Sequence, residues 1–131
     1  MSEGKARILI IDDQPSEVKM VRMALEAAGY EVVHAYNGTE GLEKAGSESP
    51  DLIILDVMMP EKDGYAVCKE LKRSDELCNI PVILLTAVAS HVTSTRYSHA
   101  DGMTTEADDY IAKPASAADI TRSLKRLLAM E

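Results

Sequence analysis

The sequence predicts an α/β fold in which helices cover both faces of a doubly wound, five-stranded parallel sheet. Short apolar runs bounded by turn-forming residues recur along the chain, as expected for strands buried on both faces of a parallel sheet. Segments with helical periodicity separate these runs, and this alternation favours parallel strands joined by crossover helices. The most apolar runs are residues 8–11, 52–55, 82–85 and 110–112.

The first half of the chain is expected to alternate three strands with two helices. The strands are residues 6–11, 31–35 and 52–55. The first helix begins near Pro15, since proline suits the first helical turn, and Gly29 ends it. A shorter helix opens at residues 37–39, and Gly46 and Pro50 are expected to end it.

The second half adds two strands and two helices with clear boundaries. A loop containing Pro60 and Gly64 leads into a helix. Pro81 precedes the fourth strand, and the last helix begins near Ser116, a possible N-cap. The strands are residues 82–85 and 109–112. Residues 87–107 give the least clear pattern, although their first half can form a helix.

Length and composition predict one domain, residues 1–131, with an aliphatic core because Phe and Trp are absent. A net charge of −8 argues against direct binding to nucleic acid, which relies on basic side chains. No apolar stretch approaches the ~20 residues that span a bilayer, and the polar N-terminus has no signal-peptide pattern. We therefore expect a cytoplasmic protein without membrane contact, in which Cys68 and Cys78 are reduced thiols.

Polar side chains follow the strands at their carboxyl ends. Asp12 and Asp13 follow the first strand, and Asp56 follows the third. Thr86 and Lys113 follow the fourth and fifth strands. In the strand order 2-1-3-4-5, the first and third strands flank the switch point, outside which open α/β sheets bind ligands. Three carboxylates, a hydroxyl and an ammonium at this edge suit a divalent cation and a phosphoryl group.

Each of these residues alone has an ordinary structural explanation. An Asp after a strand commonly caps a helix or forms a turn, and a single Thr or Lys indicates little. The joint occurrence in this strand order is what favours a functional site.

Four segments together resemble the receiver domain of bacterial two-component response regulators, in particular single-domain regulators of the chemotaxis type. The segments are residues 10–14, residues 54–60 with Asp63 and Gly64, residues 84–87 and residues 107–114. The resemblance covers essentially the whole chain. It implies a flavodoxin-like fold with a phosphoryl-accepting aspartate.

The resemblance implies a role for each acid of the cluster. Asp56 would accept a phosphoryl group from a phosphohistidine of a sensor histidine kinase or a phosphotransfer protein. Asp13, Asp56 and the backbone carbonyl of Met58 would bind Mg²⁺ directly, and Asp12 would act through a metal-bound water.

The resemblance also implies a charge partner and a switch. Lys113 would pair with the phosphoryl group. Thr86 would move toward that group, and Tyr110 would turn inward with it as the coupled aromatic switch. Signalling would then proceed through protein contacts at the face formed by the fourth helix, fifth strand and fifth helix, with an unknown downstream protein.

The chain departs from the usual receiver pattern before the fifth strand. It is several residues longer there, around Thr93 to Thr105, and Glu106 stands where a glycine is usual. A long segment in a compact domain is commonly functional, so Thr93 to Thr105 is predicted to be a partner-specific element, with a passive insertion as the alternative.

The leading hypothesis is a stand-alone signalling module that is not an enzyme, apart from assisting its own phosphorylation and dephosphorylation. A receiver excised from a hybrid histidine kinase or a multidomain regulator is the alternative. A phosphatase-like enzyme with an aspartyl-phosphate intermediate is less favoured, because Met58 stands where its second acid would be. A flavin carrier is disfavoured because Asp12 and Asp13 would repel a flavin phosphate. Zinc ligands are not expected, since the histidines have no standard ligand spacing (His34, His91 and His99).

Overall fold

The computed structural model describes residues 6–57, 64–86, 107–112 and 116–129. The predictions for Met58, Lys113, His91, His99 and the segment from Thr93 to Thr105 fall outside these residues and stay predictions.

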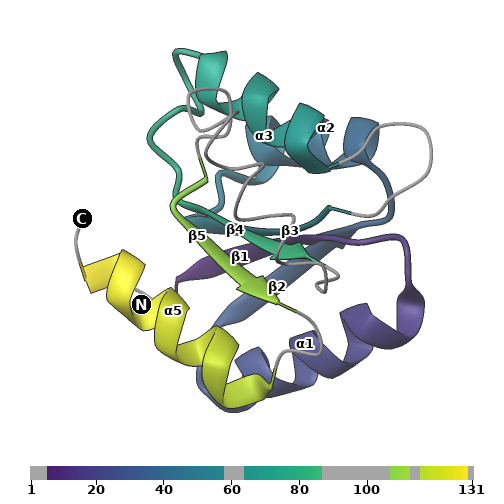
Figure 1. Cartoon of the computed structure of the whole chain (residues 1–131), viewed down its shortest axis with the longest axis vertical. Helices are drawn as coiled ribbons and strands as arrows, with labels where there is room; N and C mark the ends of the chain where they lie inside the picture. The colour runs from purple at the N-terminus through teal and green to yellow at the C-terminus, as the bar shows by residue number, and fades with distance from the viewer. Residues whose placement is uncertain (1–5, 58–63, 87–106, 113–115, 130–131) are drawn as a thin grey trace.

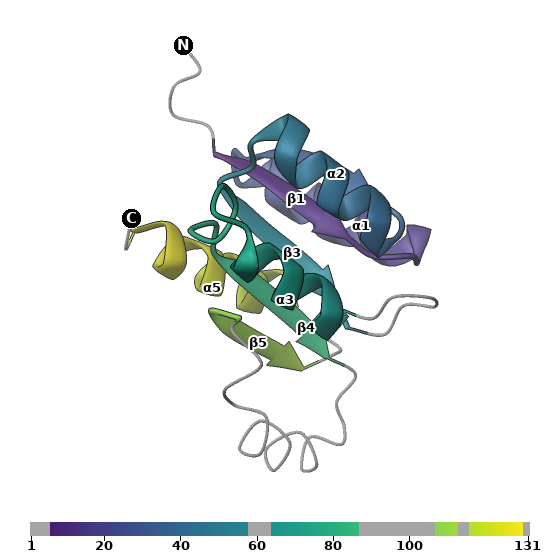
Figure 2. The same cartoon turned by 90° about the horizontal axis from the view of Figure 1, so that it is seen from above.

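Five strands form one parallel sheet in the order β2-β1-β3-β4-β5, as the sequence predicts (Figure 2). They are β1 (Arg7–Ile11), β2 (Glu31–Ala35), β3 (Leu52–Asp56), β4 (Val82–Thr86) and β5 (Asp109–Ala112). The central position of β1 and β3 explains their nearly uninterrupted apolar sequences, since both faces of each strand are covered. The two strands are paired in register, with Ile10 opposite Ile54.

Helices cover both faces of the sheet (Figure 1). The pair α1 (Pro15–Ala27) and α5 (Ala117–Ala129) lies on one face, and α2 (Gly38–Glu48) and α3 (Gly64–Arg73) lie on the other. This arrangement is the doubly wound, flavodoxin-like architecture. Among the described residues, no helix combines the length and the apolar character needed to cross a membrane.

Alternate residues of each strand pack into two separate cores. Toward α1 and α5 the strands contribute Ile8, Ile10, Val32, Leu52, Ile54, Ile83 and Leu85. Toward α2 and α3 they contribute Leu9, Ile11, Ala35, Ile53, Leu55, Val82 and Leu84. Full burial of each large aliphatic side chain contributes about 1.5–3 kcal/mol, so the sheet is a rigid base for its loops.

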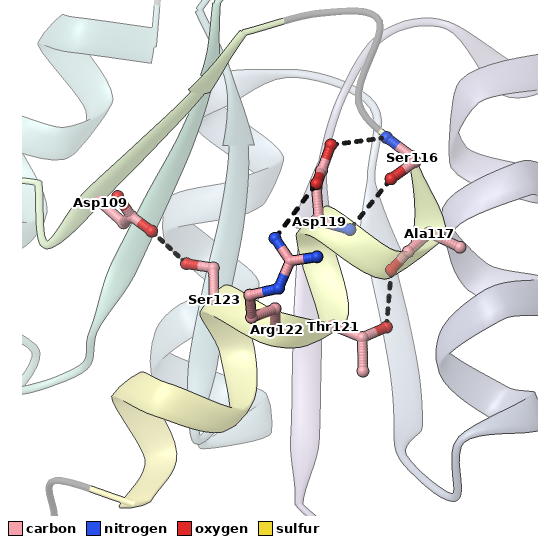
Figure 3. A network of polar contacts seen from close by, with 7 residues as sticks. All are labelled: Asp109, Ser116, Ala117, Asp119, Thr121, Arg122 and Ser123. Atoms are coloured by element: carbon pink, nitrogen blue, oxygen red, sulfur yellow. Dashed lines mark hydrogen bonds and ion pairs between the residues drawn. The ribbon is translucent and has the colours of Figure 1, made fainter.

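Capping residues predicted from the sequence end or begin two of the helices, and the end of α2 differs from the prediction. Gly29 ends α1 with a φ of +96°, and Ser116 caps α5 by accepting the Asp119 N–H at 3.0 Å (Figure 3). The prediction that Gly46 and Pro50 end α2 is confirmed for Pro50, which directly follows the C-cap, and wrong for Gly46. The helix continues to Glu48 and ends at Ser49, which has a left-handed φ of 51°. Packing of Ala45 into the core outweighs the weak helix propensity of Gly46.

Candidate functional site

The fold brings three carboxylates together at the carboxyl ends of β1 and β3. Asp12 and Asp13 leave β1, and Asp56 is the last residue of β3. One oxygen from each carboxylate lies within 4.8 Å of the others. Asp12 and Asp56 are each 1% exposed, and Asp13 is partly buried. This is the cluster that the sequence predicts at the switch point of the sheet.

Backbone contacts fix Asp12 between the strand and α1. Its N–H donates to the Ala35 carbonyl at 3.0 Å, and its Oδ1 accepts the Gln14 N–H at 2.9 Å. These contacts leave Oδ2 of Asp12 and Oδ1 of Asp13 buried with no donor in the described parts of the chain. Buried carboxylate oxygens without donors are costly, which indicates that this edge is shaped for a ligand.

A glycine brings α3 close to the backbone that carries Asp56. The Gly64 N–H donates to the Val57 carbonyl at 3.0 Å, and the Val57 N–H donates to the Leu85 carbonyl at 3.0 Å. A Cβ on Gly64 would overlap the Asp56 carbonyl oxygen and lie 2.7 Å from the Val57 Cα. Only glycine permits this approach, which fixes the end of β3 in place.

The electrostatics of the cluster disfavour its fully charged form. Burial raises the pKa of Asp12 to about 8, and the Glu17 carboxyl and the charge of Asp56 act in the same direction. The Gln14 N–H opposes this increase in pKa. A bound cation would relieve the repulsion. The donor set fits Mg²⁺, because hard divalent cations prefer carboxylate oxygens.

The structure describes only some of the other predicted site residues. Thr86 ends β4, where it pairs with Ala112 of β5, so its backbone lies at the same edge of the sheet as the acids. Tyr110 lies on β5 with its side chain 42% exposed. Lys113 lies outside the described residues, and so does Met58, whose carbonyl the resemblance adds to the site.

The histidine described by the structure belongs to a different environment. The His34 ring packs edge-to-face against Tyr36, with ring centroids 4.6 Å apart, and lies near Arg22. Within the described residues, the three aspartates are the only group of three or more metal-ligating side chains close enough to share an ion.

Sequence reasoning missed Glu17, which lies in the first turn of α1 with its carboxyl in contact with that of Asp12. The available signal was an acidic residue in the first turn of a helix that directly follows the acid pair.

Sequence reasoning also missed two polar networks around β5. Asp109 accepts hydrogen bonds from Ser123 and Arg126 of α5. The Lys72 ammonium lies 3.0 Å from Asp108, close to the start of β5. Both depend on tertiary contacts that no sequence spacing indicates.

Comparison with known proteins identifies the family. The family model of the response regulator receiver domain matches residues 8–125. The chain therefore belongs to the response regulator receiver domain family, whose members act in two-component signalling.

Curated and solved relatives agree with this assignment. The chain is 38% identical over 122 residues to the alkaline phosphatase synthesis transcriptional regulatory protein PhoP of Bacillus subtilis, a match covering 93% of this chain and 48% of PhoP. The chain thus spans about half the length of the curated relatives that it matches.

Two solved structures share both sequence and fold with this chain. The receiver domain of a signal transduction histidine kinase from Syntrophus aciditrophicus is 39% identical, with a TM-score of 0.84 over 95% of this chain and 91% of that one. Response regulator protein TrrA from Thermotoga maritima, solved in complex with Mg²⁺ and BeF, is 35% identical, with a TM-score of 0.77 over 93% of this chain and 98% of that one.

Proposed function

We propose that this domain accepts a phosphoryl group on Asp56 in the presence of Mg²⁺ and signals through protein contacts. The observation that carries the proposal is the buried cluster of Asp12, Asp13 and Asp56, with ligand oxygens within 4.8 Å of one another. The Mg²⁺ and BeF complex of TrrA supports the choice of ligand by analogy. In this proposal Asp13, Asp56 and the Met58 carbonyl hold the cation.

The proposed reaction transfers a phosphoryl group from a histidine of a kinase or phosphotransfer protein. A carboxylate oxygen of Asp56 forms a bond to phosphorus as the phosphorus–nitrogen bond of the donor breaks. The electron pair of that bond stays on the imidazole nitrogen, and the imidazole leaves neutral because its other ring nitrogen carries a proton. Mg²⁺, when bound, neutralises the acids and the phosphoryl oxygens. Asp12 and Asp13 hold negative charge beside the attacking group, and Lys113 supplies a positive charge to the phosphoryl group.

The proposed output is a change at the β5–α5 side of the molecule. Thr86 would donate to the new phosphoryl group, and Tyr110 would turn inward with it. A pocket of about 400 Å³ already borders Tyr110, between β5 and α5. Movement of Tyr110 would therefore alter a surface that can receive a partner protein.

The domain is proposed to act as a switch and not as an enzyme on other substrates. Whether it operates alone or as part of a hybrid kinase or a multidomain regulator is left open by its match to half of PhoP.

The phosphoacceptor is tested by intact mass. Incubation with Mg²⁺ and acetyl phosphate should add one phosphoryl group to the wild-type chain and none to Asp56→Asn. Asp109→Asn is the matched control, because Asp109 lies at the opposite end of its strand from the predicted site and should not affect labelling. Equal labelling of wild type and Asp56→Asn would show that another residue is the acceptor.

A further inference from the structure

Glu17 lies in the turn that connects the acid cluster to α1. The Glu17 N–H donates to the Gln14 carbonyl at 3.0 Å, and the Gln14 N–H donates to Oδ1 of Asp12 at 2.9 Å. These two hydrogen bonds hold the first turn of the helix against the end of β1. The Glu17 side chain is partly buried, and its carboxyl contacts that of Asp12.

The carboxyl groups of Glu17 and Asp12 are within hydrogen-bonding reach of each other. Ionised carboxylates have only acceptor atoms, so two of them can share this space only with a proton or a cation between or beside them. Oδ2 of Asp12 is buried and has no donor in the described parts of the chain. A cation at the cluster would bind that oxygen and would also relieve the repulsion between Glu17 and Asp12.

We infer that Glu17 is a positioning residue for the divalent cation, acting as a fourth negative charge that strengthens its binding without being a direct ligand. The inference rests on the proposed function, because the cation is the one proposed for Asp13 and Asp56. Affinity for hard divalent cations rises with the number of negative charges at a site. Glu17 thus supplements the three aspartates from the next element of the chain.

A purely structural role for Glu17 makes a different prediction. A carboxylate in the first turn of a helix stabilises that helix through its macrodipole, with or without a metal. In that case, removing the charge would lower the stability of the protein but leave its dissociation constant for Mg²⁺ unchanged. The two roles are therefore separated by a binding measurement on folded protein.

The test is isothermal titration calorimetry with Mg²⁺ at fixed pH and ionic strength, on variants shown to be folded by circular dichroism. Glu17→Gln should weaken Mg²⁺ binding roughly three- to tenfold, the scale expected for one charge near a partly buried cation. Glu17→Asp keeps the charge and should stay within about twofold of wild type. Glu26→Gln, on the last turns of the same helix, makes the same change in net charge and should bind like wild type.

A folded Glu17→Gln protein with the wild-type dissociation constant would overturn the inference. Glu17→Ser provides a second charge-removing variant if the first does not fold, with the same expected weakening. Asp13→Asn separates this failure from failure of the proposed function. Loss of binding in Asp13→Asn with no change in Glu17→Gln would refute only the role of Glu17. Unchanged binding in Asp13→Asn would refute the cation site and this inference with it.

Discussion

The aspartates at the switch point and the aspartate at the start of β5 are held in opposite ways. Oxygens of Asp12 and Asp13 are buried without donors in the described parts of the chain. The Asp109 carboxylate accepts a hydrogen bond from the Ser123 hydroxyl (Figure 3). It also accepts hydrogen bonds from Arg126 at 2.7 Å and from the Tyr110 N–H at 2.9 Å. Aspartate oxygens thus lack hydrogen-bond donors at the switch point, whereas those of Asp109 have donors from the fold.

Asp108, a second acid near β5, also has hydrogen-bond and charge partners within the fold. Oδ2 of Asp108 accepts the Val82 N–H at 2.9 Å and lies 3.0 Å from the Lys72 ammonium, whose side chain is 10% exposed. Acids that find partners within the fold act as structural ties between elements. An acid that the fold buries with one oxygen lacking a donor reduces stability, and such residues are typical of functional sites. In the proposed function, the acids near β5 therefore stabilise the fold, and the acids at the switch point bind the cation.

The largest expected effect concerns the space behind Asp56. Gly64→Ala should destabilise the protein by about 2–4 kcal/mol, because its Cβ would meet backbone atoms that cannot move aside. Gly46→Ala is the matched control, since nothing lies within 4 Å of a Cβ there. It should stabilise α2 by up to about 1 kcal/mol. Urea unfolding measures both, and a Gly64→Ala variant as stable as wild type would show that the switch-point edge is not tightly fitted.

The pH dependence of stability should show that Asp12 is buried at the switch point with a raised pKa. Because the pKa of Asp12 is raised from 3.8 to about 8 in the folded state, the folded protein binds more protons than the unfolded chain between these values. Stability should therefore fall as pH rises through this window, by about 3 kcal/mol between pH 5 and pH 8 without metal. Denaturant unfolding at several pH values measures the slope. Asp12→Asn should flatten it, and a wild-type stability that rises over this range would contradict the description of the cluster.

A smaller effect is expected from the compensated region. Ser123→Ala removes a hydroxyl that is 6% exposed and donates to Asp109, so it should destabilise the protein by about 1 kcal/mol. Thr121→Ala, two residues away, removes an exposed hydroxyl that bonds only within the helix, to Ala117, and should have almost no effect (Figure 3). Thermal unfolding compares the two variants. Equal losses of stability would show that the hydrogen bond between Ser123 and Asp109 contributes no more than the bond within the helix.

The sequence predicts the sheet and the acid cluster well for a physical reason. Apolar runs are local signals, and the parallel topology then brings the carboxyl ends of β1 and β3 together without further information. Gly46 was wrongly expected to help end α2, because it is a local signal that packing of Ala45 overrides. Glu17 and the tie between Asp109 and Ser123 were missed because their roles depend on turn geometry and on contacts across elements.

The central claim is that the acids at the switch point serve a cation while Asp109 serves the fold. Thermal midpoints of wild type, Asp13→Asn and Asp109→Asn, with and without 10 mM Mg²⁺, test it directly. Mg²⁺ should raise the midpoint of wild type and of Asp109→Asn by about 3–6 °C, because it binds only the folded state. Asp13→Asn should start above wild type and show no shift, whereas Asp109→Asn should start below it. A full Mg²⁺ shift in Asp13→Asn, or its loss in Asp109→Asn, would contradict the account.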